Sequence, residues 1–304
     1  MLLFLEQLLN GLQFGVFLFL LAGGLTLIFG ILGVINLAHG SLYMAGAYAA
    51  ALTARLTGSF WLGLAAAPLA AGVVGLAMEI LIIRHLYQRD HLDQVLATFG
   101  LILFFNELTA LLWGRQPLIL NVPEALNATI EIIPGAPYPL YRLLIIAAGC
   151  LVAILLYLLI RHSRIGMLIR AGSTDAEMLG AMGTNVKLLF SALFAFGAML
   201  AGFAGALAGP LLSVEIGMGE NVLILTFVVI VIGGIGSVRG AFAGAVLVGL
   251  ADTMSRAFLP GVLKLMLPAA EASGIAAGLS SMAIYILMAC ILLLRPRGLF
   301  PVTG

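Results

Sequence analysis

Residues 8–54 read LLNGLQFGVFLFLLAGGLTLIFGILGVINLAHGSLYMAGAYAAALTA and contain no Asp, Glu, Lys or Arg. This uncharged run is about twice as long as the roughly 20 apolar residues that one helix needs to cross a bilayer. The polar phrase NLAHGS, residues 36–41, interrupts it. Polar, irregular backbone is tolerated at membrane depth only where protein or a water-filled cavity covers it. The stretch therefore predicts a membrane protein whose first apolar region is broken by a covered polar segment.

The composition of the whole chain agrees with this prediction. The chain is 63% hydrophobic and 9% charged, with a mean hydropathy of +1.20. Soluble domains carry about 25% charged residues. No polar stretch is long enough to form a soluble domain, so we expect a single all-α, polytopic transmembrane domain over residues 1–304.

Apolar segments along the chain predict about eight to ten transmembrane helices. They lie at roughly 8–33, 41–57, 60–83, 95–113, 141–160, 188–212, 221–235, 241–258 and 275–294. Lys and Arg are densest in the loops at 84–89, 161–187 and 295–297. The positive-inside rule places these loops in the cytoplasm. Nine crossings with an external N-terminus fit this pattern, and ten with an internal N-terminus remain open.

The residues needed for nucleotide, metal or disulfide chemistry do not occur in the required patterns. Neither Lys187 nor Lys264 follows a Gly-x-x-x-x-Gly stretch, so the chain has no P-loop. The histidines are scattered, and Cys150 and Cys290 lie isolated in apolar runs. We therefore expect no enzyme activity and no cofactor or metal bound by this chain.

A weak internal repeat points to a translocation pathway. The phrase at 29–46 aligns with that at 229–244, and each runs from apolar residues through a polar, glycine-rich break into a small-residue helix. Paired, Gly-interrupted segments are the best sequence indicator of a transporter's binding site. The alternative is a structural role, in which these residues satisfy the backbone freed by the breaks. The pathway candidates are Asn36, His39, Gly40, Ser41, Ser237, Arg239 and Gly240.

The cytoplasmic segment 161–187 contains a predicted short helix at 174–183. A capping box begins it and a glycine ends it, and between them three apolar residues share one face. Such an edge suits docking into a groove of a partner protein, and an interfacial helix lying on lipid is the alternative. The residues concerned are Thr174 and Glu177 (capping box), Met178, Leu179 and Met182 (apolar edge), and Gly183 (end).

Together these phrases resemble the permease subunits of branched-chain amino acid ABC importers, of the LivH type. The resemblance spans nearly the whole chain in order. Its carrying phrases lie at 24–48, 96–101, 166–186, 196–205, 233–245 and 295–300. The chain departs from the family's usual pattern at Arg239, where proline is common, and at Glu177-Met178, where an Ala-Ala pair is usual. Arg239 thus adds a charge beside the expected pathway.

The resemblance implies a division of labour among subunits. The chain would pair with a second permease, as a LivM-like heterodimer, with two cytosolic ATPase subunits that use ATP, and with an external solute-binding protein. It would import branched-chain or other hydrophobic amino acids, or close analogues, by alternating access across a bacterial or archaeal cytoplasmic membrane. The 174–183 helix would be its coupling helix.

A rival interpretation is a stand-alone, ion-coupled secondary transporter or channel. Such a protein needs carboxylates within the membrane, and only Glu107 and Asp252 are candidates. Each could line a pathway or pair within the bundle, and we expect pairing. Glu79 lies about one turn before Arg84 and is expected to pair with it.

Overall fold

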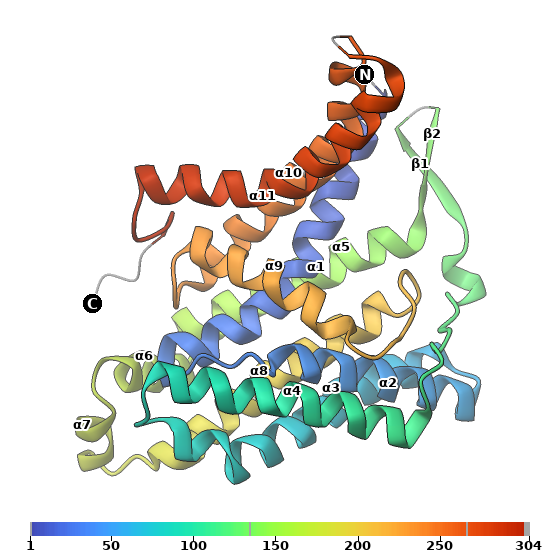
Figure 1. Cartoon of the computed structure of the whole chain (residues 1–304). Coiled ribbons are helices and arrows are strands. Elements are labelled where there is room, and N and C mark those ends of the chain that lie inside the picture. The colour runs from blue at the N-terminus through green and yellow to red at the C-terminus, as the bar shows by residue number, and fades with distance from the viewer. Residues whose placement is uncertain (1, 134, 266, 301–304) are drawn as a thin grey trace.

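The computed structural model describes residues 2–133, 135–265 and 267–300, and its described part is almost entirely helical (Figure 1). The α-helices are α1 (Leu2–Leu32), α2 (His39–Thr57), α3 (Phe60–Leu81), α4 (His91–Trp113), α5 (Leu140–His162), α6 (Arg164–Thr174), α7 (Ala176–Ala181), α8 (Val186–Ala208), α9 (Met218–Gly233), α10 (Val238–Leu263) and α11 (Ala269–Leu294). Short 3-10 helices η1 (Ile83–Leu86) and η2 (Glu124–Leu126) and an antiparallel hairpin of β1 (Thr129–Ile133) and β2 (Ala136–Pro139) complete the fold.

The predicted all-α polytopic membrane protein is confirmed. Among the described residues, seven helices are long and apolar enough to cross a membrane: α1, α3, α4, α5, α8, α10 and α11. The apolar helix α9 is shorter, with 16 residues, and α2 is a largely buried helix of 19 residues. Each predicted apolar segment corresponds to one helix, but seven of these nine helices qualify as spans, one fewer than the lower end of the expected eight to ten.

Helix α1 forms the centre of the bundle (Figure 1). In its apolar window 83% of the residues are buried, and it packs against α8, α10, α5 and α9. Helices in lipid pack through van der Waals contact between small residues. At Gly24, for example, a Cβ atom would lie 2.5 Å from the carbonyl oxygen of Gly197 in α8. Glycine is therefore what lets α1 and α8 approach so closely.

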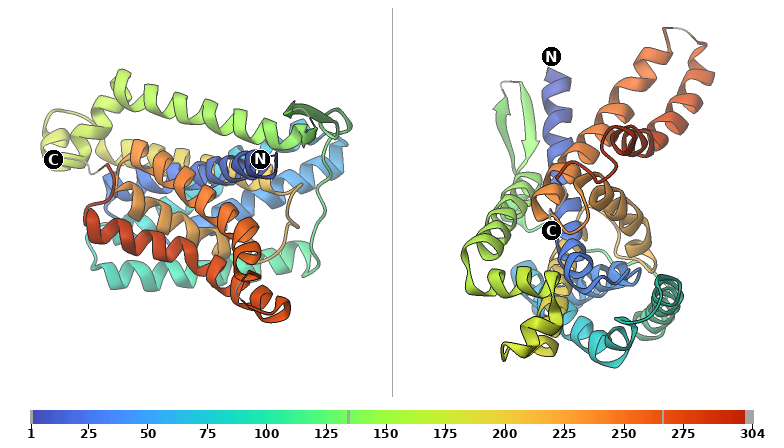
Figure 2. Two further views of the ribbon diagram at one scale, coloured as in Figure 1. Left: turned by 90° about the horizontal axis from the view of Figure 1, so that it is seen from above. Right: turned by 90° about the vertical axis from the view of Figure 1, so that its left-hand side faces the viewer.

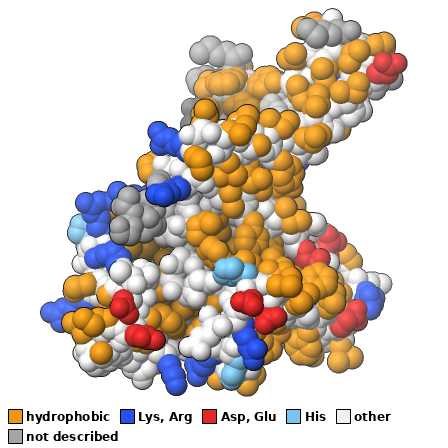
Figure 3. All heavy atoms as spheres, turned by 60° about the vertical axis from the view of Figure 1, so that its left-hand side comes forward, with side chains coloured by type: hydrophobic (Ala, Val, Ile, Leu, Met, Phe, Trp, Pro, Cys, Tyr) orange, Lys and Arg blue, Asp and Glu red, His pale blue; other side chains and the backbone are white. Residues whose placement is uncertain are grey.

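The connections between helices fall at two opposite ends of the molecule. The β1–β2 hairpin lies at one end and α6 and α7 lie at the other, while the end of α10 and the start of α11 project from the rest of the bundle (Figures 1 and 2). Lys and Arg side chains are spread over the end that carries α6 and α7 (Figure 3). The side of the membrane that each end faces stays a prediction.

Candidate functional site

The first predicted break returns the chain into the interior of the bundle. Gly33 has φ +65°, a conformation that favours glycine, and it reverses the chain after α1. One turn into α2, the ring of Tyr43 lies 6.0 Å from the ring of Phe17. Phe17 precedes the end of α1 by 15 residues, or about 22 Å along the helix axis. Helix α2 therefore begins deep inside the bundle instead of at its surface.

Polar side chains at the start of α2 are buried without partners. Asn36 and His39 are fully buried, and neither side chain makes a hydrogen bond within the described part of the chain. The hydroxyl of Thr26 in α1 is likewise buried and has no hydrogen-bond partner among the described residues, and Ser41 is also buried. Buried polar groups are normally paired, and unpaired ones within a membrane bundle are typical of functional sites.

The second predicted break lies against the last turn of α1, which directly precedes the first break. Ser237 caps α10 by accepting a hydrogen bond from the Gly240 N–H at 3.1 Å. Gly240 packs on the backbone of Gly233 at the end of α9. A Cβ atom at Gly30, in the last turn of α1, would lie 2.5 Å from the Cα of Gly236. The fold thus brings together the two regions that the repeat pairs in the sequence.

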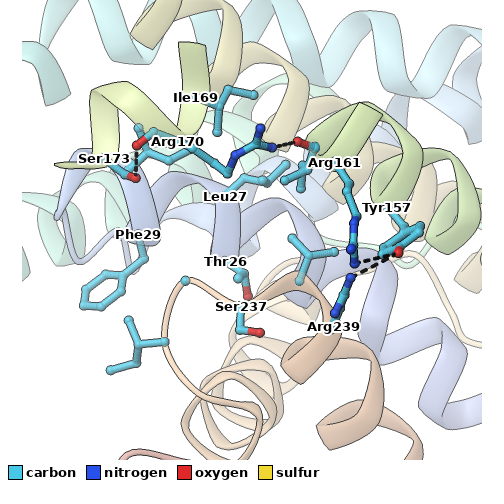
Figure 4. Close-up of a pocket in the computed structure, with 16 residues that line it drawn as sticks. Thr26, Leu27, Phe29, Tyr157, Arg161, Ile169, Arg170, Ser173, Ser237 and Arg239 are labelled. Carbon is cyan, nitrogen blue, oxygen red and sulfur yellow. Dashed lines mark hydrogen bonds between the residues drawn. The ribbon is translucent and has the colours of Figure 1, made fainter. Parts of the chain in front are cut away.

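A cavity of about 680 Å³ opens beside this junction, at the end that carries α6 (Figure 4). Ser237 and Arg239 line it, whereas Asn36, His39, Gly40 and Ser41 do not. The predicted pathway residues are therefore divided between this cavity and the buried start of α2. The lining residues are Thr26, Leu27, Phe29, Gly30, Ile31, Tyr157, Ile160, Arg161, Ile169, Arg170, Ser173, Ile235, Gly236, Ser237, Val238 and Arg239.

Three arginines from three different helices meet in this cavity. Arg239 donates a hydrogen bond to the Tyr157 hydroxyl at 3.0 Å, and its guanidinium lies 4.9 Å from the centre of the Tyr157 ring. Arg161 donates to the same hydroxyl at 3.1 Å, and Arg170 donates to the Ile160 carbonyl. The residues that line the cavity include no Asp or Glu. Sequence reasoning missed Tyr157, Arg161 and Arg170 as cavity residues. Tyr157 lies within a predicted span, and the basic segment that holds Arg161 and Arg170 indicated only topology and a coupling helix.

The structure corrects the predicted start of the coupling helix. Thr174 does not cap it, because α6 continues through Thr174, whose hydroxyl donates to the Arg170 carbonyl at 3.1 Å. Asp175 has the extended backbone of an N-cap residue and accepts from the Met178 N–H at 2.9 Å. The predicted capping box of Thr174 and Glu177 is therefore wrong, and Asp175 holds that position.

Helix α7 is also shorter than predicted, and one predicted edge residue faces inward. It covers Ala176–Ala181, and Gly183 follows it with φ +88°, as expected for a terminating glycine. Leu179 is only 5% exposed and packs near Gly172 of α6. Met178 and Met182 are 61% and 76% exposed. The exposed apolar edge, called the methionine edge below, therefore consists of Met178 and Met182 alone.

Comparison with known proteins identifies the family. Residues 7–292 match the family model described as "Branched-chain amino acid transport system / permease component". The chain belongs to this permease family. The permease is 30% identical, over 84% of its length and 87% of theirs, to the LivH proteins of Salmonella typhimurium and Escherichia coli, named high-affinity branched-chain amino acid transport system permease proteins. It is 31% identical to BraD of Pseudomonas aeruginosa over 82% of this chain and 85% of that protein. No solved structure matches it significantly.

Carboxylates of the permease are paired with arginines, as expected. Glu107 accepts from Arg115 at 3.0 Å, and Asp252 pairs with Arg256 one turn later at 2.9 Å. Neither carboxylate lines the 680 Å³ cavity, and Asp252 lines a separate cavity of about 400 Å³ between α1 and α10. The fully buried Glu79 pairs with Arg84 at 3.1 Å, which confirms that prediction. Nothing in these pairs favours an ion-coupled mechanism.

Proposed function

We propose that this permease is the membrane-spanning subunit of an ABC importer that carries branched-chain or other hydrophobic amino acids by alternating access. Separate ATPase subunits drive the transport. The family match supports the transport class, and the relatives' names support the substrate class. The exposed methionine edge on α7 supports the need for a partner, and it is the observation that carries the proposal.

The proposed assembly consists of four kinds of subunit. The permease pairs with a LivM-like second permease, binds two cytosolic ATPase subunits, and receives substrate from an external solute-binding protein. The assembly lies in a bacterial or archaeal cytoplasmic membrane. The basic end of the permease faces the cytosol, in line with the positive-inside rule, so α7 lies where an ATPase can reach it (Figure 1).

The substrate pathway passes the start of α2 in this proposal. Asn36 and His39 supply unpaired polar atoms there, next to the apolar interior of the bundle. A site for an apolar amino acid needs both a few polar groups and apolar walls. In an outward-to-inward transition, the re-entrant start of α2 is the segment whose displacement would open the interior.

The decisive experiment places a charge on the methionine edge. Met182→Asp should weaken ATPase binding, because burying an unpaired carboxylate in an apolar groove costs on the order of a few kcal/mol, or roughly a hundredfold in affinity. The variant should insert normally, lose the ATPase subunits on co-purification, and lose substrate-stimulated ATP hydrolysis.

Asn185→Asp is the matched control. It adds the same charge three residues later and keeps the N-cap of α8, where the Asn185 side chain accepts from the Leu188 N–H at 3.0 Å. Retained ATPase binding and transport in Met182→Asp would refute docking through α7. Uptake by the isolated permease, driven by an ion gradient without ATP, would refute the importer assignment itself.

A further inference from the structure

The arginine cluster of the large cavity lacks a counter-ion. Arg84, Arg115 and Arg256 each pair with a carboxylate. Arg161, Arg170 and Arg239 are exposed and make no ion pair with any described residue. Other arginines, such as Arg89 and Arg164, are also without an ion pair among the described residues, but these three line one cavity together. Guanidinium groups stay charged at every physiological pH. Three cations in one partly apolar cavity repel one another, so the cavity is suited to an anion.

An apolar groove leads out of this cavity. A second cavity of about 390 Å³ lies between α5 and α10 over α1, and it shares Tyr157, Val238 and Arg239 with the first. Its other lining residues are Phe19, Cys150, Ala153, Ile154 and Phe242, and Arg239 is its only charged one. The groove therefore starts at the arginine cluster and continues along an apolar surface.

The groove lies on an exposed, apolar side of the bundle, which in this proposal faces lipid. Helix α5 has the highest mean hydropathy of the long helices, 3.1, yet only 17% of its window is buried. Its exposed side chains are large and apolar, among them Leu151, Ile154 and Leu155. A ligand in the groove can therefore enter sideways from the bilayer.

We propose that an anionic phospholipid binds here, with its phosphate among Arg161, Arg170 and Arg239 and an acyl chain in the groove. Guanidinium groups bind phosphate through charge-assisted, often bidentate hydrogen bonds. Basic pockets between helices at the cytoplasmic side suit anionic headgroups. A free phosphate would leave the groove unused, and a zwitterionic lipid would bring its own cation toward three arginines. The proposal rests on this geometry and does not depend on the transported substrate.

The bound lipid would join elements that otherwise touch little at this end. Arg161 lies in the last turn of α5, Arg170 lies in α6, and Arg239 lies in the first turn of α10. One phosphate held by all three would fix α6, and through it the neighbouring α7, against the bundle. We therefore expect the lipid to stabilise the purified protein.

The test uses the full chain, purified with any subunits that assemble with it and stripped of lipid by detergent exchange. Thermal stability and native mass spectrometry are measured with phosphatidylglycerol, phosphatidylcholine and inorganic phosphate. Phosphatidylglycerol should bind and raise the melting temperature, while the other two should not. Replacing Arg161 and Arg239 with Gln should weaken phosphatidylglycerol binding about 25-fold, since each arginine contributes about fivefold.

Two further variants separate a lipid site from a general loss of structure. Ala153→Trp fills the groove and should reduce lipid binding while all three arginines remain. Arg89→Gln removes a cation outside the cavity and should leave lipid binding unchanged. Equal binding of phosphatidylcholine, an equal effect of phosphate alone, unchanged binding in both cavity variants, or lipid binding only when a second permease subunit is absent would each overturn the proposal.

Discussion

At the scale of single residues, glycines decide how closely the helices approach. Gly40 in α2 faces Gly219 in α9, and a Cβ atom at Gly40 would lie 2.5 Å from the Gly219 carbonyl oxygen. Both contacting atoms belong to backbone, so neither side can move away cheaply. By contrast, Gly100 in α4 has no atom within 4 Å of such a Cβ position.

Gly40→Ala should therefore destabilise the protein by about 1–3 kcal/mol through overpacking. Gly100→Ala should be neutral or stabilising, because alanine favours helix by up to about 1 kcal/mol. Melting temperatures of both variants in the same detergent test this difference. Equal melting temperatures would show that α2 and α9 separate freely at Gly40.

The buried Glu79 shows how one residue can tie several elements together. Its carboxylate accepts hydrogen bonds from Arg84 and Tyr87, at 3.1 and 2.8 Å, and from Ser191 in α8 at 2.7 Å. Burial, and then the hydrogen bond to Glu79, raises the pKa of the Tyr87 hydroxyl well above its ordinary value. The network links the end of α3, η1 and the start of α8, which follows α7 in the chain.

Glu79→Ala should cost about 1–3 kcal/mol, because it removes the acceptor of partly buried donors, while Arg84, which is 34% exposed, can be hydrated instead. Glu107→Ala is the control, since its pair with Arg115 is exposed and exposed pairs contribute about 0–1 kcal/mol. Thermal or denaturant unfolding compares the two. Similar losses from both variants would contradict the assigned role of Glu79.

At the scale of elements, α7 depends on its cap. Six residues are too few for a helix that is stable by itself. Its order rests on the Asp175 carboxylate at its start and on Leu179 packed toward α6. A weakened cap should therefore loosen the methionine edge without disturbing the membrane helices.

Asp175→Ala should destabilise α7 by about 1 kcal/mol, which is roughly a fivefold faster hydrogen exchange at the Met178 amide. Thr174→Ala should leave that exchange rate unchanged, because Thr174 belongs to α6. Hydrogen-exchange mass spectrometry on both variants measures the effect. Faster exchange in Thr174→Ala alone would restore the capping box that the sequence suggested.

At the scale of the whole molecule, the two ends of the bundle differ in charge and structure. The end with α6 and α7 carries the basic loops, and the opposite end carries the β1–β2 hairpin (Figures 1 and 3). These two ends lie on opposite sides of the bundle. Labelling one position at each end therefore shows which end faces the cytosol.

In a background without native cysteines, Ala181→Cys should resist a membrane-impermeant thiol reagent in intact cells and react in inverted vesicles. Glu131→Cys in β1 should show the opposite behaviour. Both positions are exposed in the structure, so access to each depends on its side of the membrane. Labelling of Ala181→Cys from outside would reverse the orientation and exclude α7 as the ATPase contact.

The sequence alone determined the fold class, the approximate positions of the nine apolar helices, and the pairing of Glu79 with Arg84. These features are local, because lipid requires each spanning segment to be apolar and to satisfy its own backbone. The sequence also indicated both breaks, because polar residues beside glycine disrupt an apolar helix whichever helices it packs against.

Only the tertiary structure decided which distant residues share a site. It separated Asn36 and His39 from Arg239, and it gathered Arg161, Arg170 and Arg239 from three helices into one cavity. It also moved the cap of α7 to Asp175, because the cap depends on where the preceding helix ends. Close contacts between glycines set these positions, and a linear pattern marks such glycines without showing which of them meet.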